Sequence, residues 1–237
     1  MTTGGIPATF RGVRRIRDAI EDFGEMLFFA LDTLRWAVRP PFRPELILIQ
    51  MAAIGVGSVF IVTTTSFFTG VVLALQANYA MRQLGAEGYV GGSVAISLAR
   101  ELAPVLTALF VIGRSGSAIS TEIGTMRVTE QIDAMETMAV NPVQYLVVPR
   151  LIASLAMFPL LTMVFDALGY AGAYLMGIYV ARIPEGPFLE HTRTLVDPKD
   201  IFHGIFKSLI FGAVVASSIA ILLVDVGFVL VTVGSGK

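Results

Sequence analysis

Long apolar runs alternate with short polar segments along most of this chain. The first run is the clearest, because no charged side chain occurs in the 36 residues from Leu46 to Met81. A helix needs only about 20 apolar residues to cross a bilayer, and a span must satisfy its own backbone hydrogen bonds, as a helix does. The pattern therefore predicts an all-α polytopic membrane protein. The apolar runs cover 46–78, 91–119, 151–181 and 208–233.

The segments within and between these runs predict how the spans are joined. "RQLGAEGYVGG", at 82–92, is a short glycine-rich turn. Pro159 and Asp166 interrupt the third apolar run, which is long enough to tilt or to project beyond the bilayer. The polar, proline-containing stretch at 182–200 is expected to form an extramembrane loop or a pair of short helices.

The segment before the first run has a different pattern. Between residues 16 and 38 apolar side chains recur at helical spacing, with arginines at the edges of the stripe and Trp36 near its end. This is typical of an amphipathic helix lying in the membrane interface, although a helix packed on a soluble partner or a plain N-terminal tail fits the same residues. We divide the chain into a cytoplasmic, interfacial segment at 1–45 and a transmembrane domain at 46–237.

An acidic segment, "TEIGTMRVTEQIDAMETMAVNP", separates the second and third runs at 121–142. Thr129 is a suitable N-cap, and Asn141 ends the helix because a residue before proline disfavours the α conformation. The predicted helix at 129–140 is about 18 Å long, too short to cross a bilayer. Ile132 and Met135 lie on one face of it and Asp133 on the other. It is either a re-entrant or surface helix linking two spans, or a helix that docks on a soluble partner.

Composition and charge narrow the function classes. The chain is 55% hydrophobic and 15% charged, with mean hydropathy +0.76, whereas soluble domains carry about 25% charged residues. A net charge of −1 gives no basic excess for nucleic acid, and the absence of cysteine excludes disulfides and thiol chemistry. Catalytic, metal and nucleotide motifs are absent, so we expect neither a catalytic residue nor a metal site.

Arginine placement predicts the orientation. Seven arginines in the first 45 residues place the N-terminus in the cytoplasm, because positively charged loops stay on that side. Counting spans from there puts the turn at 76–92 outside, the acidic segment at 121–142 in the cytoplasm and the stretch at 182–200 outside.

Ionisable side chains inside the runs are candidate functional groups, because a charge in lipid costs a few kcal/mol. Arg100 and Glu101 point about 100° apart on a helix, so each is expected to meet a partner on another helix, another subunit or a polar ligand, unless both snorkel to the membrane surface. Arg114 lies among small residues that predict close helix packing. Asp166 and Asp225 fit either hydrogen bonding between helices, which we favour, or a proton relay.

Several motifs give the chain a family resemblance. The segments "GVVLALQ" (70–76) and "KSLIFGAVVAS" (207–217) extend it beyond the region 98–153. Within that region the motifs are REL-P (Arg100–Pro104), GR-GSA (Gly113–Ala118), TEIG (Thr121–Gly124), EQI-A-M (Glu130–Met135) and NP---VPR (Asn141–Arg150). From about residue 45 onward the chain closely resembles the permease subunits of MCE-associated ABC transporters, the MlaE/YrbE family.

The resemblance implies a homodimeric permease in the bacterial inner membrane, with about five transmembrane helices after the interfacial helix. It implies a cytosolic ABC ATPase dimer that holds ATP and Mg²⁺, so that no cofactor is expected in this chain. Further implied partners are a periplasmic MCE-domain protein, a small cytosolic subunit of the STAS type, and phospholipid or a related lipid as cargo.

The resemblance also assigns residues. It makes the helix between the second and third spans a coupling helix, with docking residues Glu130, Asp133, Met135 and Glu136. It places a lipid cavity at the dimer interface, open to the periplasm. That cavity is expected to be lined by Leu73, Gln76, Ala80, Met81, Leu84, Arg100 and Glu101, with apolar side chains along the acyl chains and Arg100 near a polar or phosphate group.

The C-terminal part departs from the family pattern. Relatives have two C-terminal spans joined by a polar stretch, but here "KSLIFGAVVAS" runs directly into "SIAILLVDVGFVLVTV", so the last two spans are expected to be shortened or spliced near 217–218. Two other functions fit the residues. One is a proton-coupled secondary transporter using Glu101, Asp166 and Asp225, although no internal repeat supports it; the other is a structural membrane anchor for a cytosolic complex.

Overall fold

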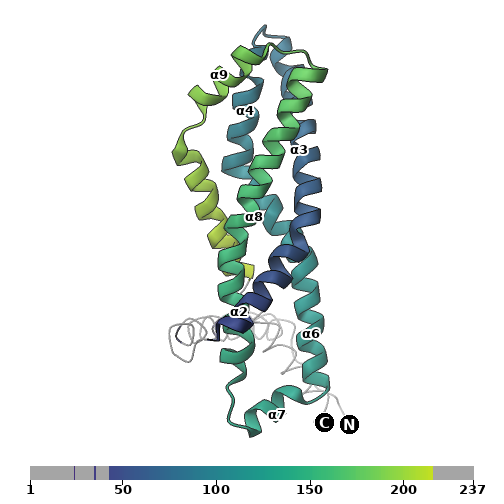
Figure 1. The fold of residues 1–237 in the computed structure, drawn as a ribbon, viewed down its shortest axis with the longest axis vertical. Coiled ribbons are helices and arrows are strands. Elements are labelled where there is room, and N and C mark those ends of the chain that lie inside the picture. The colour runs from purple at the N-terminus through teal and green to yellow at the C-terminus, as the bar shows by residue number, and fades with distance from the viewer. Residues whose placement is uncertain (1–23, 25–34, 36–42, 216–237) are drawn as a thin grey trace, which may run out of the picture.

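The computed structural model describes Gly24, Arg35 and residues 43–215, apart from the side chain of Glu136, and this part of the chain is helical without a strand. Three of its helices are long and apolar enough to cross a membrane. They form an elongated bundle with α7 at one end and α9 at the other (Figure 1). The all-α membrane fold is thereby confirmed, whereas the predicted interfacial helix and the junction near 217–218 lie outside the described residues.

Each span is a run of α-helix interrupted by π-helical turns. The first comprises α2 (Pro44–Met51), η1 (Ala52–Val56) and α3 (Gly57–Arg82). The second begins with the 3₁₀ turn η2 (Glu87–Tyr89) and continues through α4 (Val90–Ser97), η3 (Leu98–Leu102), α5 (Ala103–Val111), η4 (Ile112–Gly116) and α6 (Ser117–Val128). The third comprises η5 (Val143–Val147), α8 (Val148–Leu175) and η6 (Met176–Val180).

The spans are longer than the apolar runs that predicted them. They contain 39, 42 and 38 residues, which corresponds to about 57–63 Å of helix, roughly twice the hydrocarbon thickness of a bilayer. Much of the excess is polar, as in α6, which continues to Val128 beyond the predicted end at residue 119. The spans therefore project well beyond the membrane.

The third span is continuous through Pro159 and Asp166, the two residues that interrupt its apolar sequence. Both residues lie inside α8. Proline is tolerated in a membrane helix where neighbouring helices hold the chain in place. Here Phe158 and Leu161, on either side of the proline turn, are almost completely buried in the core, so packing maintains the helix through this point.

Small residues bring α3 and α8 into close contact. A Cβ atom added to Gly70 would overlap the carbonyl oxygen of Gly169, and one added to Gly172 would overlap the carbonyl oxygen of Phe67. In lipid, where helix association depends on van der Waals packing, glycine allows two backbones to approach this closely. This seam holds the first and third spans together.

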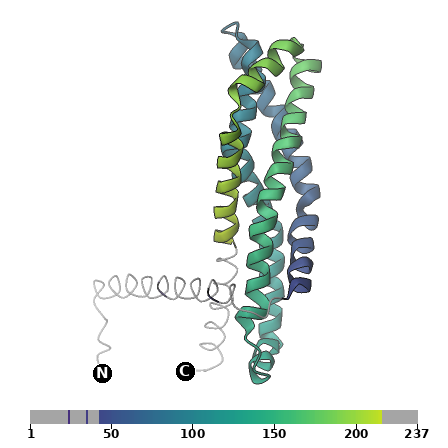
Figure 2. The same ribbon diagram turned by 60° about the vertical axis from the view of Figure 1, so that its left-hand side comes forward.

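The polar stretch at 182–200 contains one short helix and the start of another. Helix α9 (Glu185–Leu195) packs on α4, with Phe188 fully buried near Gly91 and Gly177. A last helix covers 198–215 and begins ten residues before the apolar run at 208. It runs back alongside the bundle (Figures 1 and 2).

Candidate functional site

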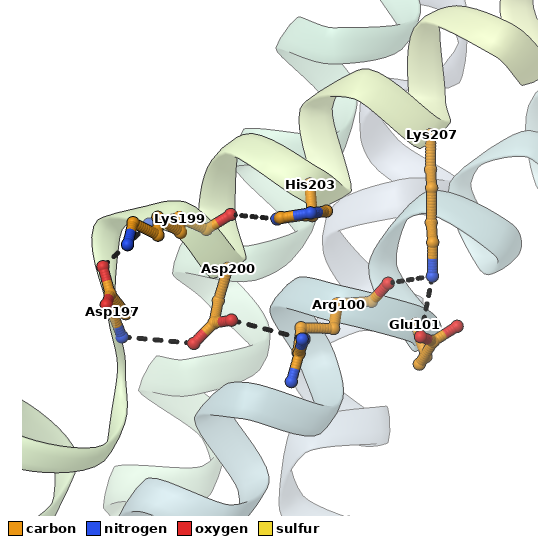
Figure 3. A network of polar contacts seen from close by, with 7 residues as sticks. All are labelled: Arg100, Glu101, Asp197, Lys199, Asp200, His203 and Lys207. Carbon is orange, nitrogen blue, oxygen red and sulfur yellow. Dashed lines mark hydrogen bonds and ion pairs between the residues drawn. The ribbon is translucent and has the colours of Figure 1, made fainter.

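Arg100 and Glu101 lie in the π-helical turn η3 and both contact the helix at 198–215 (Figure 3). Arg100 Nε is 3.2 Å from Asp200 Oδ1, and Lys207 Nζ is 2.7 Å from Glu101 Oε1. Lys207 also donates to the Arg100 carbonyl oxygen at 2.9 Å. The prediction that each residue of the pair meets a partner on another helix is therefore confirmed.

The start of the helix at 198–215 explains why Asp200 is fixed in place. Asp197 Oδ1 accepts a hydrogen bond from Lys199 N, and Asp200 Oδ2 accepts one from Asp197 N, both at 3.1 Å. This reciprocal arrangement is a capping box, which satisfies backbone donors at a helix N-terminus. Asp200 thus uses one carboxylate oxygen to cap its own helix and the other to bind Arg100.

The cluster of Arg100, Glu101, Asp200 and Lys207 is neutral as a whole but only partly buried. The side chains of Arg100 and Glu101 are 51% and 67% exposed, whereas that of Asp200 is 12% exposed. Arg100 therefore has accessible N–H donors besides the one that faces Asp200. Because a guanidinium binds phosphate or carboxylate through such donors, the cluster has the chemistry to accept an anionic headgroup.

The predicted lipid-lining residues of α3 do not join this cluster within one chain. The side chain of Leu98 and the carbonyl oxygen of Ser66 both approach Gly169, so the level of η3 matches α3 near residue 66. Along α3, Leu73 is seven residues farther and Met81 fifteen, about 10 Å and 22 Å away, and Leu84 lies beyond the end of α3 at Arg82. Leu73 and Met81 are partly buried against the core, whereas Gln76, Ala80 and Leu84 are exposed.

The predicted coupling helix is present but shorter than expected. Helix α7 covers Gln131–Thr137, not 129–140. The assignment of Thr129 as its N-cap is wrong, because Thr129 is the C-cap residue of α6 and its hydroxyl donates back to the Thr125 carbonyl oxygen at 2.7 Å. Glu130 then adopts φ 57°, a left-handed conformation that turns the chain between the two helices.

The predicted coupling residues occupy different positions on this segment. Glu130 and Asp133 are exposed and Met135 is half-buried, whereas only the backbone of Glu136 is described. Asp133 forms an ion pair with Arg127 of α6. Two large apolar side chains that were not among the predicted coupling residues are strongly exposed beside them, Val128 at 70% and Met138 at 67%.

Arg114 and Asp166 are two further ionisable residues that the sequence placed within the spans. Arg114 Nη1 donates to the Ala53 carbonyl oxygen at 3.4 Å, and the hydroxyls of Ser58 and Ser115 are 3.3 Å apart. The first span therefore contacts this region at Arg114 and at the buried Ser115, whereas Gly113, which was expected to belong to a tight packing seam, faces open space. Asp166 Oδ1 is buried without a hydrogen-bond partner in the described part of the chain, so the hydrogen bond between helices that we favoured for it is not formed there.

One further ion pair lies near the end of the bundle that carries α7. Arg150 Nη2 of α8 is 2.8 Å from Glu122 Oε2 of α6, and the Arg150 side chain is only 2% exposed. Sequence reasoning placed both residues in motifs but did not pair them. The partners Asp200 and Lys207 were also missed, although "DPKD" at 197–200 is readable as a capping box.

Comparison with known proteins gives consistent matches over most of the chain. A family model described as Permease MlaE matches residues 47–229. A probable ABC transporter permease protein of Rickettsia bellii is 39% identical over 205 residues, which cover 86% of this chain and 79% of the relative. The intermembrane phospholipid transport system permease protein MlaE of Haemophilus influenzae is 37% identical over 195 residues, covering 81% and 73%.

Proposed function

This chain belongs to the MlaE permease family, and we propose that it is the permease subunit of an ABC transporter for phospholipid or a related lipid. The lipid passes between the bacterial inner membrane and a periplasmic MCE-domain protein. Two copies of the chain form the permease, a separate cytosolic ATPase dimer binds ATP and Mg²⁺, and a small STAS-type subunit joins on the cytosolic side. The name of the Haemophilus influenzae relative, which specifies phospholipid transport, supports the choice of cargo.

The observation that carries the proposal is the position of α7. It lies at the end of the bundle beyond the long spans (Figure 1), and seven residues are too few to cross a membrane. Its surroundings combine the exposed acid Glu130 with the exposed apolar residues Val128 and Met138. An exposed apolar patch next to charged groups is typical of a protein interface, and we assign this one to the ATPase.

The lipid path follows from the exposed side of α3 and the charged cluster on η3. Exposed apolar residues of α3, among them Val72, Leu75 and Tyr79, continue the surface of Gln76 and Ala80. Acyl chains lie along this surface, and the headgroup meets the accessible donors of Arg100. The second copy of the chain closes the cavity, which brings the two parts of the lining together across the dimer.

The coupling role is tested with Glu130→Arg combined with Met138→Glu. The complex is reconstituted with its ATPase, and both co-purification of the ATPase and ATP-driven phospholipid transfer are measured. We expect both to fall by about ten-fold or more, because a reversed charge and a buried carboxylate at an interface each cost more than 1 kcal/mol. The matched control is Glu190→Arg, a charge reversal on the exposed face of α9 at the opposite end, which should change neither.

Two results would contradict the proposal. One is parent-like ATPase binding and transport in the double variant. The other is a parent complex in which mass spectrometry finds neither an ATPase nor phospholipid. If a pH gradient alone drove transport without an ATPase, the proton-coupled alternative using Glu101, Asp166 and Asp225 would replace it; Asp225 lies outside the described residues.

A further inference from the structure

Helix α7 connects the end of α6 to the start of the third span, and α6 and α8 lie apart near this connection. Helix α6 and the first turns of α8 descend separately, and α7 crosses between them (Figure 1). Among the described helices, the most extensive backbone contacts of α6 are with α7 and with its own preceding turn η4. Any displacement of α7 could therefore spread α6 and α8 apart instead of moving them together, unless a side chain joins the two.

The ion pair between Glu122 and Arg150 makes that connection. It joins α6 to α8 at 2.8 Å. Among the hydrogen bonds and ion pairs of the described residues, this is the one that connects these two helices. Glu122 stands six residues before the end of α6 at Val128, which is about 9 Å of helix. The ion pair thus joins α6 and α8 close to the point where α6 ends next to α7.

Because Arg150 is buried, it depends on Glu122 as its partner. The guanidinium of Arg150 is almost completely buried, and its Nε and Nη1 atoms have no hydrogen-bond partner among the described residues. A buried charge held by one partner depends on that partner, so Arg150 favours arrangements in which Glu122 stays beside it. Glu122 is half-exposed and reaches inward from α6 to do so.

The turns around α7 are also held in place. Glu130 and Ala139, on either side of α7, have φ 57° and φ 58°, conformations that are costly for residues other than glycine and are kept only where the surroundings fix them. Arg127 of α6 binds Asp133 of α7, and Asn141 Oδ1 accepts a hydrogen bond from Val143 N at 2.9 Å where the third span begins. The segment therefore has defined connections at both ends.

We propose that Glu122 and Arg150 are positioning residues that lock α6 and α8 into one lever carrying α7. When the ATPase displaces α7, the ion pair makes the second and third spans move together, so that ATP hydrolysis is converted into lipid movement. This inference rests on the proposed function, and it assigns to the pair a role in coupling, distinct from ATPase binding and from lipid binding.

The test replaces the pair by apolar residues of similar size, Glu122→Leu with Arg150→Met. Such a replacement commonly preserves stability because it removes both charges together. In the reconstituted complex we expect ATPase binding and ATP hydrolysis to persist, while the ratio of phospholipid transferred to ATP hydrolysed falls by about ten-fold. A ratio within about two-fold of the parent value would overturn the proposal.

Single variants keep the test decisive if the double variant fails to assemble. Glu122→Gln retains an oxygen acceptor for Arg150, whereas Glu122→Ala removes it, so the transport ratio should fall less in the glutamine variant. Equal ratios in these two variants would overturn the proposal. The matched control is Glu87→Ala, which removes the carboxylate of the exposed pair with Arg82 at the other end of the bundle and should leave the ratio unchanged.

Failure of the inference is distinguishable from failure of the proposed function. If the unsubstituted complex binds no ATPase or transfers no phospholipid, the proposed function fails. If the unsubstituted complex transfers lipid and the Glu122 and Arg150 variants do so with the same ratio, only the lever is refuted.

Discussion

At the scale of single residues, opposite charges allow ionisable groups to occupy the second span. Arg100 faces Asp200, and Glu101 faces Lys207, so the four formal charges cancel. Neutral clusters are less costly in a membrane than isolated charges. The half-exposed guanidinium of Arg100 remains available for a ligand, which a fully enclosed ion pair would not be.

The packing of Gly70 against α8 leaves no room for a larger side chain. Replacing it with alanine places a methyl group against the backbone oxygen of Gly169, which cannot move aside as a flexible side chain could. We expect Gly70→Ala to lower the free energy of unfolding by about 1–3 kcal/mol through overpacking, measured by thermal unfolding in detergent. Gly186→Ala is the control, because open space surrounds Gly186; equal losses in both variants would contradict the seam.

At the scale of elements, α7 is defined by how it begins and ends. The residues that limit it, Glu130 and Ala139, turn the chain through left-handed conformations. Each such residue costs about 1–2 kcal/mol, so neither turn would persist without the contacts around it. A short helix placed between two fixed turns is suited to transmitting a displacement without unwinding.

Glycine substitutions test this description of α7. Ala139→Gly should relieve about 1 kcal/mol of strain and leave α7 at least as stable as in the parent. Ala134→Gly, in the middle of the helix and exposed, should cost about 1 kcal/mol. Hydrogen exchange of the amides at 131–137 measures the difference, with about five-fold faster exchange expected for Ala134→Gly alone. Faster exchange in the Ala139→Gly variant would show that the turn is not strained.

At the scale of the whole molecule, three spans separate the two ends of the bundle. Helix α7 and helix α9 are joined by the single third span, Val143–Val180, so they should lie on opposite sides of the membrane. The arginine-rich N-terminal segment further predicts that the α7 side is cytoplasmic. The end of α6 at Val128 and the start of the third span at Val143, which flank α7, are then predicted to extend into the cytoplasm.

The absence of cysteine makes this topology directly measurable. Single cysteines are introduced as Ala134→Cys in α7 and Gly186→Cys in α9, and intact cells are treated with a membrane-impermeant thiol reagent after the outer membrane is permeabilised. We expect Gly186→Cys to be labelled and Ala134→Cys to be labelled only after the inner membrane is opened. The unsubstituted chain is the blank. Labelling of both cysteines in intact cells would refute the proposed orientation.

The sequence by itself determined the all-α membrane fold, the approximate positions of three spans and the existence of a short polar helix between two of them. These features follow from hydropathy and local helix signals, which depend on neighbouring residues in the chain. The same local reasoning failed at Thr129, whose hydroxyl donates to a carbonyl oxygen of the preceding helix.

Only the tertiary structure decided which charges meet. Arg100 and Asp200 are 100 residues apart in sequence, Glu101 and Lys207 are 106 apart, and Glu122 and Arg150 belong to different spans. Their pairing depends on which helices are neighbours and at what depth each residue lies. For the Arg100 and Glu101 pairs, the close approach of Gly204 to the Ala99 carbonyl oxygen brings the two helices together. Hydropathy carries no such information, because it places a residue in the membrane without saying what it faces.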